Sequence, residues 1–228
     1  MGQEILKIED APTGTFTPTG PLEPFELKLG KVIDLSKLCP GDLILVSSVK
    51  LTVVGGAIRK VQAQVYQGEH ARWEHAAIYI GKGFICEATR QGVAMATLSK
   101  YMVNHVIRAR RDNTLSLQQQ YEIAIHALTR QNATYSYLEI GKLWYKATFG
   151  LKKSAGQNMD KLGYYFPARA TICSQLYGEC YLEVANKLLN NLRDGTVTPA
   201  GLSSSKLLTD VKLNWLAIAV ATDSEQAL

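Results

Sequence analysis

Hydrophobic and polar positions change their spacing several times along the chain, and each spacing predicts a kind of element. The apolar run at 43–46 follows turn-forming residues at 39–42, which predicts a buried strand. Two apolar runs about the tripeptide 81–83 predict a β-hairpin. A further strand is predicted over 103–110. The first half of the chain therefore supplies most of the strands.

Helical spacing dominates the later part of the sequence. Apolar residues recur with this spacing at 115–130 and 171–189, and a further helix is predicted over 138–150. The segments 11–24 and 199–205 are rich in proline, glycine or small polar residues, which predicts irregular structure in both.

These patterns divide the chain into two parts. Residues 1–30 are interpreted as an N-terminal arm that contains a Pro-, Thr- and Gly-rich linker. Residues 31–228 are interpreted as a single domain with an insertion at about 140–170.

Composition and charge exclude several classes of protein. Hydrophobic residues make up 46% of the chain and charged residues 20%, which excludes disordered, collagen-like and coiled-coil proteins. The formal net charge of +5 is too small an excess to predict nucleic-acid binding. The basic cluster at 108–111 and the pair at 152–153 offer a contact to an anionic polymer or membrane, but we interpret them as a solvated strand end and a solvated loop.

The chain shows no standard export signal and no stretch suited to span a membrane. The beginning of the sequence lacks the basic and apolar regions of a signal peptide, and the late apolar stretch at 215–222 is too short to cross a bilayer. We therefore expect synthesis in the cytoplasm and no stable membrane insertion. The four cysteines form no close pair, so we expect free thiols, no metal site and no cofactor.

One cysteine has the setting of a nucleophile. Cys173 falls at the start of a predicted helix, where unpaired N–H groups and the helix dipole stabilise a thiolate. Thiolate catalysis also needs an imidazole and a group that orients it. With 81–83 as the hairpin loop, His75 and Glu87 become diagonal neighbours on one face, with Cβ atoms about 7 Å apart. Residue types alone leave a structural role for Cys173 and His75 open.

The remaining histidines and cysteines lack such a setting. Glu74 neighbours His75 in sequence, but strand alternation directs it to the opposite face. We expect structural or solvent-facing roles for His70, His105, His126, Cys39, Cys86 and Cys180.

Four short motifs lie in a characteristic order within residues 38–205. They are Gly41–Ile44, Glu74–Gly81, Ile85–Ala88 and Ile172–Leu176. Together they resemble the circularly permuted NlpC-type papain-like cysteine hydrolases of the YiiX-like group, in which the histidine strand precedes the cysteine helix. The resemblance implies a triad of Cys173 as nucleophile, His75 as acid and base, and Glu87 as the group that orients His75.

We accordingly expect an α+β, permuted papain-like fold, in which a curved antiparallel sheet of about five or six strands packs on the Cys173 helix. The expected reaction is amide hydrolysis through a thioester acyl-enzyme. The backbone N–H of Cys173 is expected to hold the oxyanion. Tyr135, Ser174 and Gln175 are expected to line the substrate site.

The resemblance implies a peptide of peptidoglycan as substrate, and hence an endopeptidase or amidase. Such a target lies outside the cytoplasm, which suggests an antibacterial toxin delivered by a specialised secretion system, with a cognate inhibitor or immunity protein as partner. A lipid-directed thiol hydrolase or acyltransferase is one alternative, and a non-catalytic binding module on the same fold is another. Acyl release from vesicles would identify the first alternative, and an unreactive Cys173 would identify the second.

Overall fold

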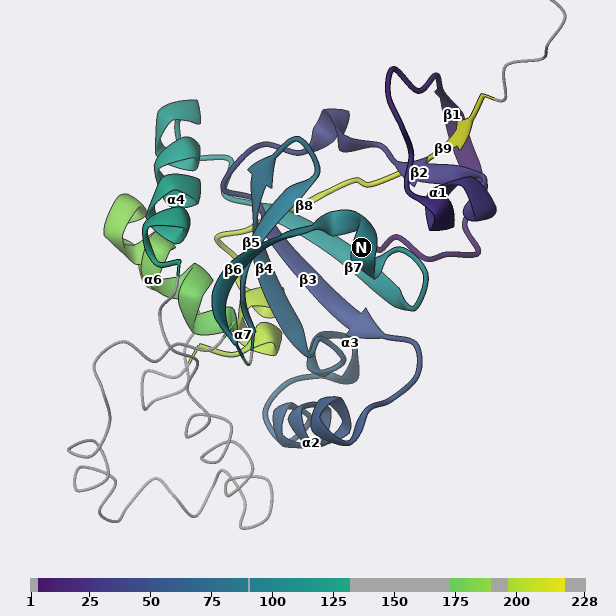
Figure 1. Ribbon diagram of the computed structural model, residues 1–228. Helices are drawn as coiled ribbons and strands as arrows, with labels where there is room; N and C mark the ends of the chain where they lie inside the picture. Colours follow the sequence, from purple (N-terminus) through teal and green to yellow (C-terminus); the bar gives the residue numbers. More distant parts are fainter. Residues whose placement is uncertain (1–3, 90, 132–172, 190–196, 220–228) are drawn as a thin grey trace, which may run out of the picture.

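A computed structural model describes residues 4–89, 91–131, 173–189 and 197–219 of the chain. Its centre is a six-stranded antiparallel sheet in the order β6-β5-β4-β3-β7-β8, and a smaller three-stranded sheet in the order β1-β9-β2 lies beside it (Figure 1). The large sheet consists of β3 (Leu43–Ser48), β4 (His75–Gly81), β5 (Phe84–Thr89), β6 (Gly92–Thr97), β7 (His105–Arg111) and β8 (Thr209–Val211). The small sheet consists of β1 (Pro12–Phe16), β2 (Lys31–Ile33) and β9 (Trp215–Ile218).

Helices pack around the two sheets, with α1 against the small one, and the α+β class expected from the sequence is confirmed (Figure 1). They are α1 (Pro24–Leu29), α2 (Val53–Gln62), α3 (Gly68–Ala71), α4 (Leu117–Thr129), α6 (Cys173–Ala185) and α7 (Pro199–Ser204), with the short 3₁₀ helices η1 (Leu35–Lys37) and η2 (Leu98–Tyr101). The predicted helix at 115–130 corresponds to α4, which begins at a capping box between Ser116 and Gln119. The predicted helix at 138–150 and the whole insertion at about 140–170, with the basic pair at 152–153, lie outside the described residues.

Both faces of the large sheet are buried, and strand alternation divides its apolar side chains between two cores. Leu43 and Leu45 of β3 face α4 and α6, whereas Ile44 and Val46 face the core shared with the N-terminal segment. A strand that is buried on both faces needs apolar residues at every position, which explains the uninterrupted run in the sequence.

The β4–β5 hairpin has the predicted register up to Tyr79 and a different turn. Tyr79 pairs with Ile85 and Ile78 pairs with Cys86, as expected, but the register shifts after Tyr79 and Gly81 rather than Ile80 pairs with Phe84. The turn therefore consists of Lys82 and Gly83, one residue shorter than predicted. Lys82 and Gly83 both adopt positive φ, at 51° and 81°, as a tight hairpin turn requires. This register places His75 and Glu87 on the same face of the sheet, as the sequence predicted.

The proline-rich segment at 11–24 contains a strand, which the sequence pattern did not predict. β1 runs parallel to β9 and lies at the edge of the small sheet, where proline is tolerated because one side of the strand needs no hydrogen bonds. Further upstream, Leu6 is buried and exchanges two backbone hydrogen bonds with Ile107 of β7. The N-terminal segment therefore packs against the large sheet.

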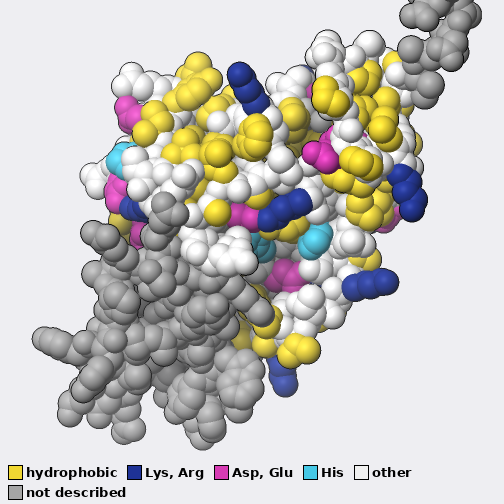
Figure 2. Space-filling model, in the orientation of Figure 1, with side chains coloured by type: hydrophobic (Ala, Val, Ile, Leu, Met, Phe, Trp, Pro, Cys, Tyr) yellow, Lys and Arg dark blue, Asp and Glu magenta, His cyan; other side chains and the backbone are white. Residues whose placement is uncertain are grey.

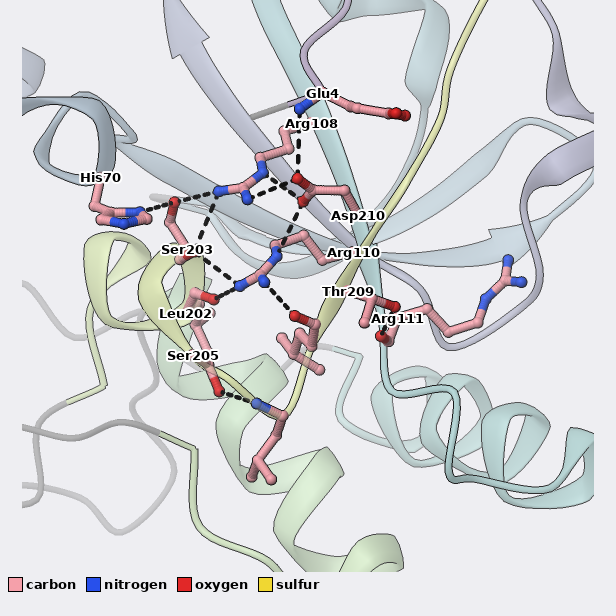
Figure 3. A network of polar contacts seen from close by, with 12 residues as sticks. Glu4, His70, Arg108, Arg110, Arg111, Leu202, Ser203, Ser205, Thr209 and Asp210 are labelled. Atoms are coloured by element: carbon pink, nitrogen blue, oxygen red, sulfur yellow. Dashed lines mark hydrogen bonds and ion pairs between the residues drawn. The ribbon is translucent and has the colours of Figure 1, made fainter. Parts of the chain in front are cut away.

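Two of the three arginines in the basic cluster of β7 lie inside the protein, so the interpretation as a solvated strand end is wrong for them. Arg108 and Arg110 are 4% and 6% exposed, and both pair with Asp210 of β8 (Figure 3). Arg110 also donates to the carbonyls of Leu202 and Ser203 at the end of α7. The two guanidinium groups thereby fasten α7 and β8 to β7, and their burial keeps them from contact with an anionic polymer.

The helix α7 replaces the irregular segment predicted at 199–205. The Thr198 hydroxyl accepts a hydrogen bond from Gly201 N–H at 3.0 Å, and Pro199 occupies the first turn. This is a standard start of a helix, and the arginines of β7 satisfy its last carbonyls.

Candidate active site

Cys173 is the first residue of α6, at the junction between that helix and β4. The helix is anchored by side chains that are fully buried in the core, namely Leu176, Tyr177, Cys180 and Tyr181. Cys173 itself is 7% exposed. Its sulfur accepts hydrogen bonds from the backbone N–H groups of Ala76 and Ser174. The start of α6 and the start of β4 thus converge on one thiol.

His75 is the first residue of β4 and contacts both other members of the predicted triad. Its Nε2 lies 2.7 Å from Glu87 Oε2 on the neighbouring strand, as the hairpin geometry predicted. The imidazole also forms a hydrogen bond with Cys173, and the bond to Glu87 leaves Nδ1 available for it. The His75 side chain is 21% exposed, whereas Glu87 is 1% exposed. The imidazole can therefore reach solvent or substrate, and the carboxylate behind it cannot.

The electrostatics of the pair favour a thiolate and an imidazolium. Burial raises the pKa of Cys173, but the positive charge of His75, its hydrogen bond and the N–H groups of Ala76 and Ser174 outweigh burial and hold the pKa below its usual value. Burial lowers the pKa of His75, but the thiolate of Cys173 and the hydrogen bonds to Cys173 and Glu87 outweigh it and raise the pKa.

Two residues that the sequence analysis missed complete the site around Glu87. Lys100 of η2 donates a hydrogen bond to Glu87 Oε1, and the Tyr101 hydroxyl donates to Oε2 at 2.6 Å. The Tyr101 ring lies 5.8 Å from that of His75 and meets His105 edge-on at 5.0 Å. Tyr101 therefore supports both the orienting carboxylate and the imidazole.

These donors keep Glu87 ionised although it is buried. Burial raises the pKa of Glu87, but the hydrogen bond and charge of His75, followed by the hydrogen bonds of Lys100 and Tyr101, lower it to about 2. An ionised Glu87 stabilises the imidazolium and fixes the orientation of the ring. Histidine, acidic and basic side chains lie together near the middle of the face in Figure 2.

We expect the Tyr101→Phe variant to lose about 1–2 kcal/mol of unfolding free energy, because it removes a hydrogen bond to a charged, buried group. The phenyl ring retains the contacts with His75 and His105. The pKa of Glu87 should rise in this variant, while the bond between Glu87 and His75 remains. Urea unfolding measures the change, with Tyr121→Phe as control because Tyr121 is 48% exposed. Equal stabilities of the two variants would contradict this role of Tyr101.

The predicted substrate-lining residues are only partly in place. The Ser174 side chain is fully buried and donates to the Val197 carbonyl at 2.7 Å, so its hydroxyl cannot contact substrate. Gln175 is half-buried and donates to Glu179 one turn along the same helix. Tyr135 lies outside the described residues. Of this set, the backbone N–H of Ser174 is the group that contacts the reactive sulfur.

The other thiols differ from Cys173 in their surroundings. All four cysteines are free. Burial raises the pKa of Cys86 and of Cys180 to about 12. Arg130 donates a hydrogen bond to Cys180 Sγ at 2.8 Å, but its charge does not offset the effect of burial. Glu74 accepts hydrogen bonds from Ser48 N–H and Arg59, away from the His75 ring, so Glu87 is the carboxylate that orients the imidazole.

The fold and site together define an α+β protein with a thiol, an imidazole and a carboxylate in contact where a helix meets an antiparallel sheet. Models of protein families and the curated proteins give no match to the sequence. Solved structures with a similar fold include the crystal structure of the metalloprotein YiiX from Escherichia coli O157:H7, with a TM-score of 0.53 and 14% identity. The match covers 77% of this chain and 97% of YiiX. At this identity the likeness concerns the fold, and it agrees with the YiiX-like group that the motifs resemble.

Proposed function

We propose that the protein is a cysteine hydrolase of the permuted papain-like, NlpC-type class and that it cleaves amide bonds. The observation that carries the proposal is the contact of one imidazole, His75, with both the Cys173 thiol and the buried Glu87 carboxylate. The opposite pKa shifts of Cys173 and His75 support an ion pair that is ready to react at neutral pH.

In the proposed mechanism the Cys173 thiolate attacks the carbonyl carbon of the substrate. The resulting oxyanion accepts hydrogen bonds from unpaired N–H groups at the start of α6, including that of Cys173. When the tetrahedral adduct collapses, the C–N bond breaks, the imidazolium of His75 protonates the leaving amine, and a thioester remains. Neutral His75 then takes a proton from water as its oxygen attacks the thioester. Release of the carboxylic acid restores the thiolate and the imidazolium.

The similarity to a protein described as a metalloprotein raises the question of a metal in this chain. Within the described ranges, no three His, Cys, Asp or Glu side chains are grouped so that they could hold a metal ion. Both oxygens of Glu87 already accept hydrogen bonds from cations or hydroxyl groups. The described residues therefore do not fit a metal, and the mechanism uses none.

A peptide of peptidoglycan is the proposed substrate, reached through delivery by a specialised secretion system and controlled by a cognate inhibitor. Purified protein should convert muropeptides into products with a new amine and a new carboxylate, which mass spectrometry detects. The Cys173→Ala variant should be inert, and periplasmic expression should harm bacteria only with Cys173 present. Intact muropeptides and identical growth of both strains would contradict this substrate.

A lipid-directed thiol hydrolase or acyltransferase is the second candidate, and one surface feature favours it. The turn between β3 and α2 exposes Val49, Leu51 and Val53, with Val53 92% exposed, and Lys50 lies among them. This turn follows the strand that pairs with His75 through Val46. Among the described helices, none is long and apolar enough to cross a bilayer. Release of fatty acid from anionic vesicles, with no change in muropeptides, would favour this candidate.

A further inference from the structure

A cavity of about 490 Å³ lies between the small sheet and the hairpin turn of the large sheet, and no residue of the triad lines it. Its apolar wall consists of Phe16, Leu22, Val32, Ile33, Leu35, Leu98, Met102 and Leu216. This volume lies within the usual range of small-molecule sites, which are mostly apolar with a few polar groups. Figure 2 shows hydrophobic side chains gathered with acidic ones over the region of α1 and β9. The cavity is therefore suited to an apolar body of small-molecule size.

The charged groups at the cavity favour one sign of ligand. Glu23, Glu26 and Asp34 line it together with a single ammonium group, that of Lys82. One oxygen of Glu26 accepts from Glu23 N–H at 3.0 Å, and one oxygen of Asp34 accepts from Ser36 N–H at 2.9 Å. Within the described residues, none of these carboxylates forms a salt bridge, so they remain available to a cation.

We propose that this cavity binds a small amphiphile with a cationic head, such as an amine that carries an apolar chain. The apolar chain would lie against the wall, and the ammonium group would contact Glu26 and Asp34. The whole chain carries +5, so unspecific attraction would favour an anion instead. A preference for the cation would therefore come from the cavity itself.

The test is isothermal titration calorimetry of the full chain with decylammonium and with decanoate, two probes of equal chain length, below their micelle concentrations. Decylammonium should bind at least about threefold more tightly than decanoate, the effect expected of one or two partly exposed ion pairs. The Glu26→Gln/Asp34→Asn double variant should weaken the binding of decylammonium by a similar factor, because it removes two negative charges. Both replacements can retain the helix caps, so the fold should be unaffected. Lys82→Asn should strengthen the binding of decylammonium, because it removes the positive charge at the cavity. Asn tolerates the positive φ at this position.

Two controls separate this site from the triad and from general charge effects. Glu9→Gln removes an exposed carboxylate outside the cavity and should leave the affinity for decylammonium unchanged. Cys173→Ala should also leave this affinity unchanged. The cavity proposal and the hydrolase proposal can therefore fail independently of each other. Leu35→Trp should fill the cavity and abolish binding. Absence of saturable binding, equal or tighter binding of decanoate, or indifference to both the double variant and Leu35→Trp would overturn the proposal.

Discussion

Alkylation of Cys173 by iodoacetamide should proceed at nearly the same rate at about pH 6 and about pH 8, because the charge of His75 and the N–H groups of Ala76 and Ser174 lower the pKa of its thiol. In His75→Ala the cation that lowers the pKa of Cys173 is gone. With an ordinary thiol pKa of about 8.5, the thiolate fraction rises roughly 80-fold between these two pH values. The alkylation rate of the variant should rise by a similar factor.

The ratio of the two rates in one protein is the informative quantity, since a change of pKa also changes the nucleophilicity of the thiolate. Mass spectrometry assigns the label to each cysteine. Cys86 and Cys180, whose pKa values burial raises to about 12, serve as internal controls and should remain unlabelled. A steep rise of the native Cys173 rate over this range, matching that of His75→Ala, would contradict the ion pair and favour the non-catalytic binding module.

Replacement of Glu87 by Gln should lower the unfolding free energy by about 3 kcal/mol at about pH 7. The pKa of this carboxyl is about 2 in the folded chain, against the usual value of 4.5. By linkage this gap corresponds to about 3 kcal/mol of stability. Gln also presents an amide N–H₂ to Lys100 or Tyr101, both of which are donors, so the loss should not be recovered by new hydrogen bonds.

The pH dependence distinguishes this effect from a simple packing defect. A carboxyl with a depressed folded pKa stabilises the protein above its unfolded pKa, and this stabilisation is lost as pH falls toward the folded value. The difference in unfolding free energy between the native protein and Glu87→Gln should therefore be constant above about pH 6 and fall to about 1 kcal/mol at about pH 3. Urea unfolding at several pH values measures it, with Glu9→Gln as control. A difference that does not change with pH would contradict the role of the ionised carboxylate.

The core of the site follows from local rules that can be applied to the sequence. The turn-forming residues near 82 indicate a hairpin, the hairpin pairs Tyr79 with Ile85, and this register places His75 diagonally from Glu87. The position of Cys173 at the start of a helix follows from helical spacing. Contact between His75 and Cys173 joins residues far apart in the chain, so only the resemblance to a family predicted it.

Residues that depend on tertiary packing were not predictable in the same way. Lys100 and Tyr101 reach Glu87 because η2 folds back after β6, and no periodicity indicates that path. Arg108 and Arg110 have the sequence appearance of a solvated cluster, and Asp210, which pairs with both, lies about a hundred residues away. The helix α7 did leave a local signal, since Thr198 followed by Pro199 is a typical helix start.

The most direct test of the account is the ionisation state of Cys173 itself. The ultraviolet absorbance of a thiolate can be measured as a difference between the native protein and Cys173→Ser during a pH titration. With the thiolate–imidazolium pair in place, this difference should already be present at about pH 5 and stay constant to about pH 8. A difference that develops only above about pH 8, as for an ordinary thiol, would contradict the thiolate–imidazolium pair and with it the proposed hydrolase.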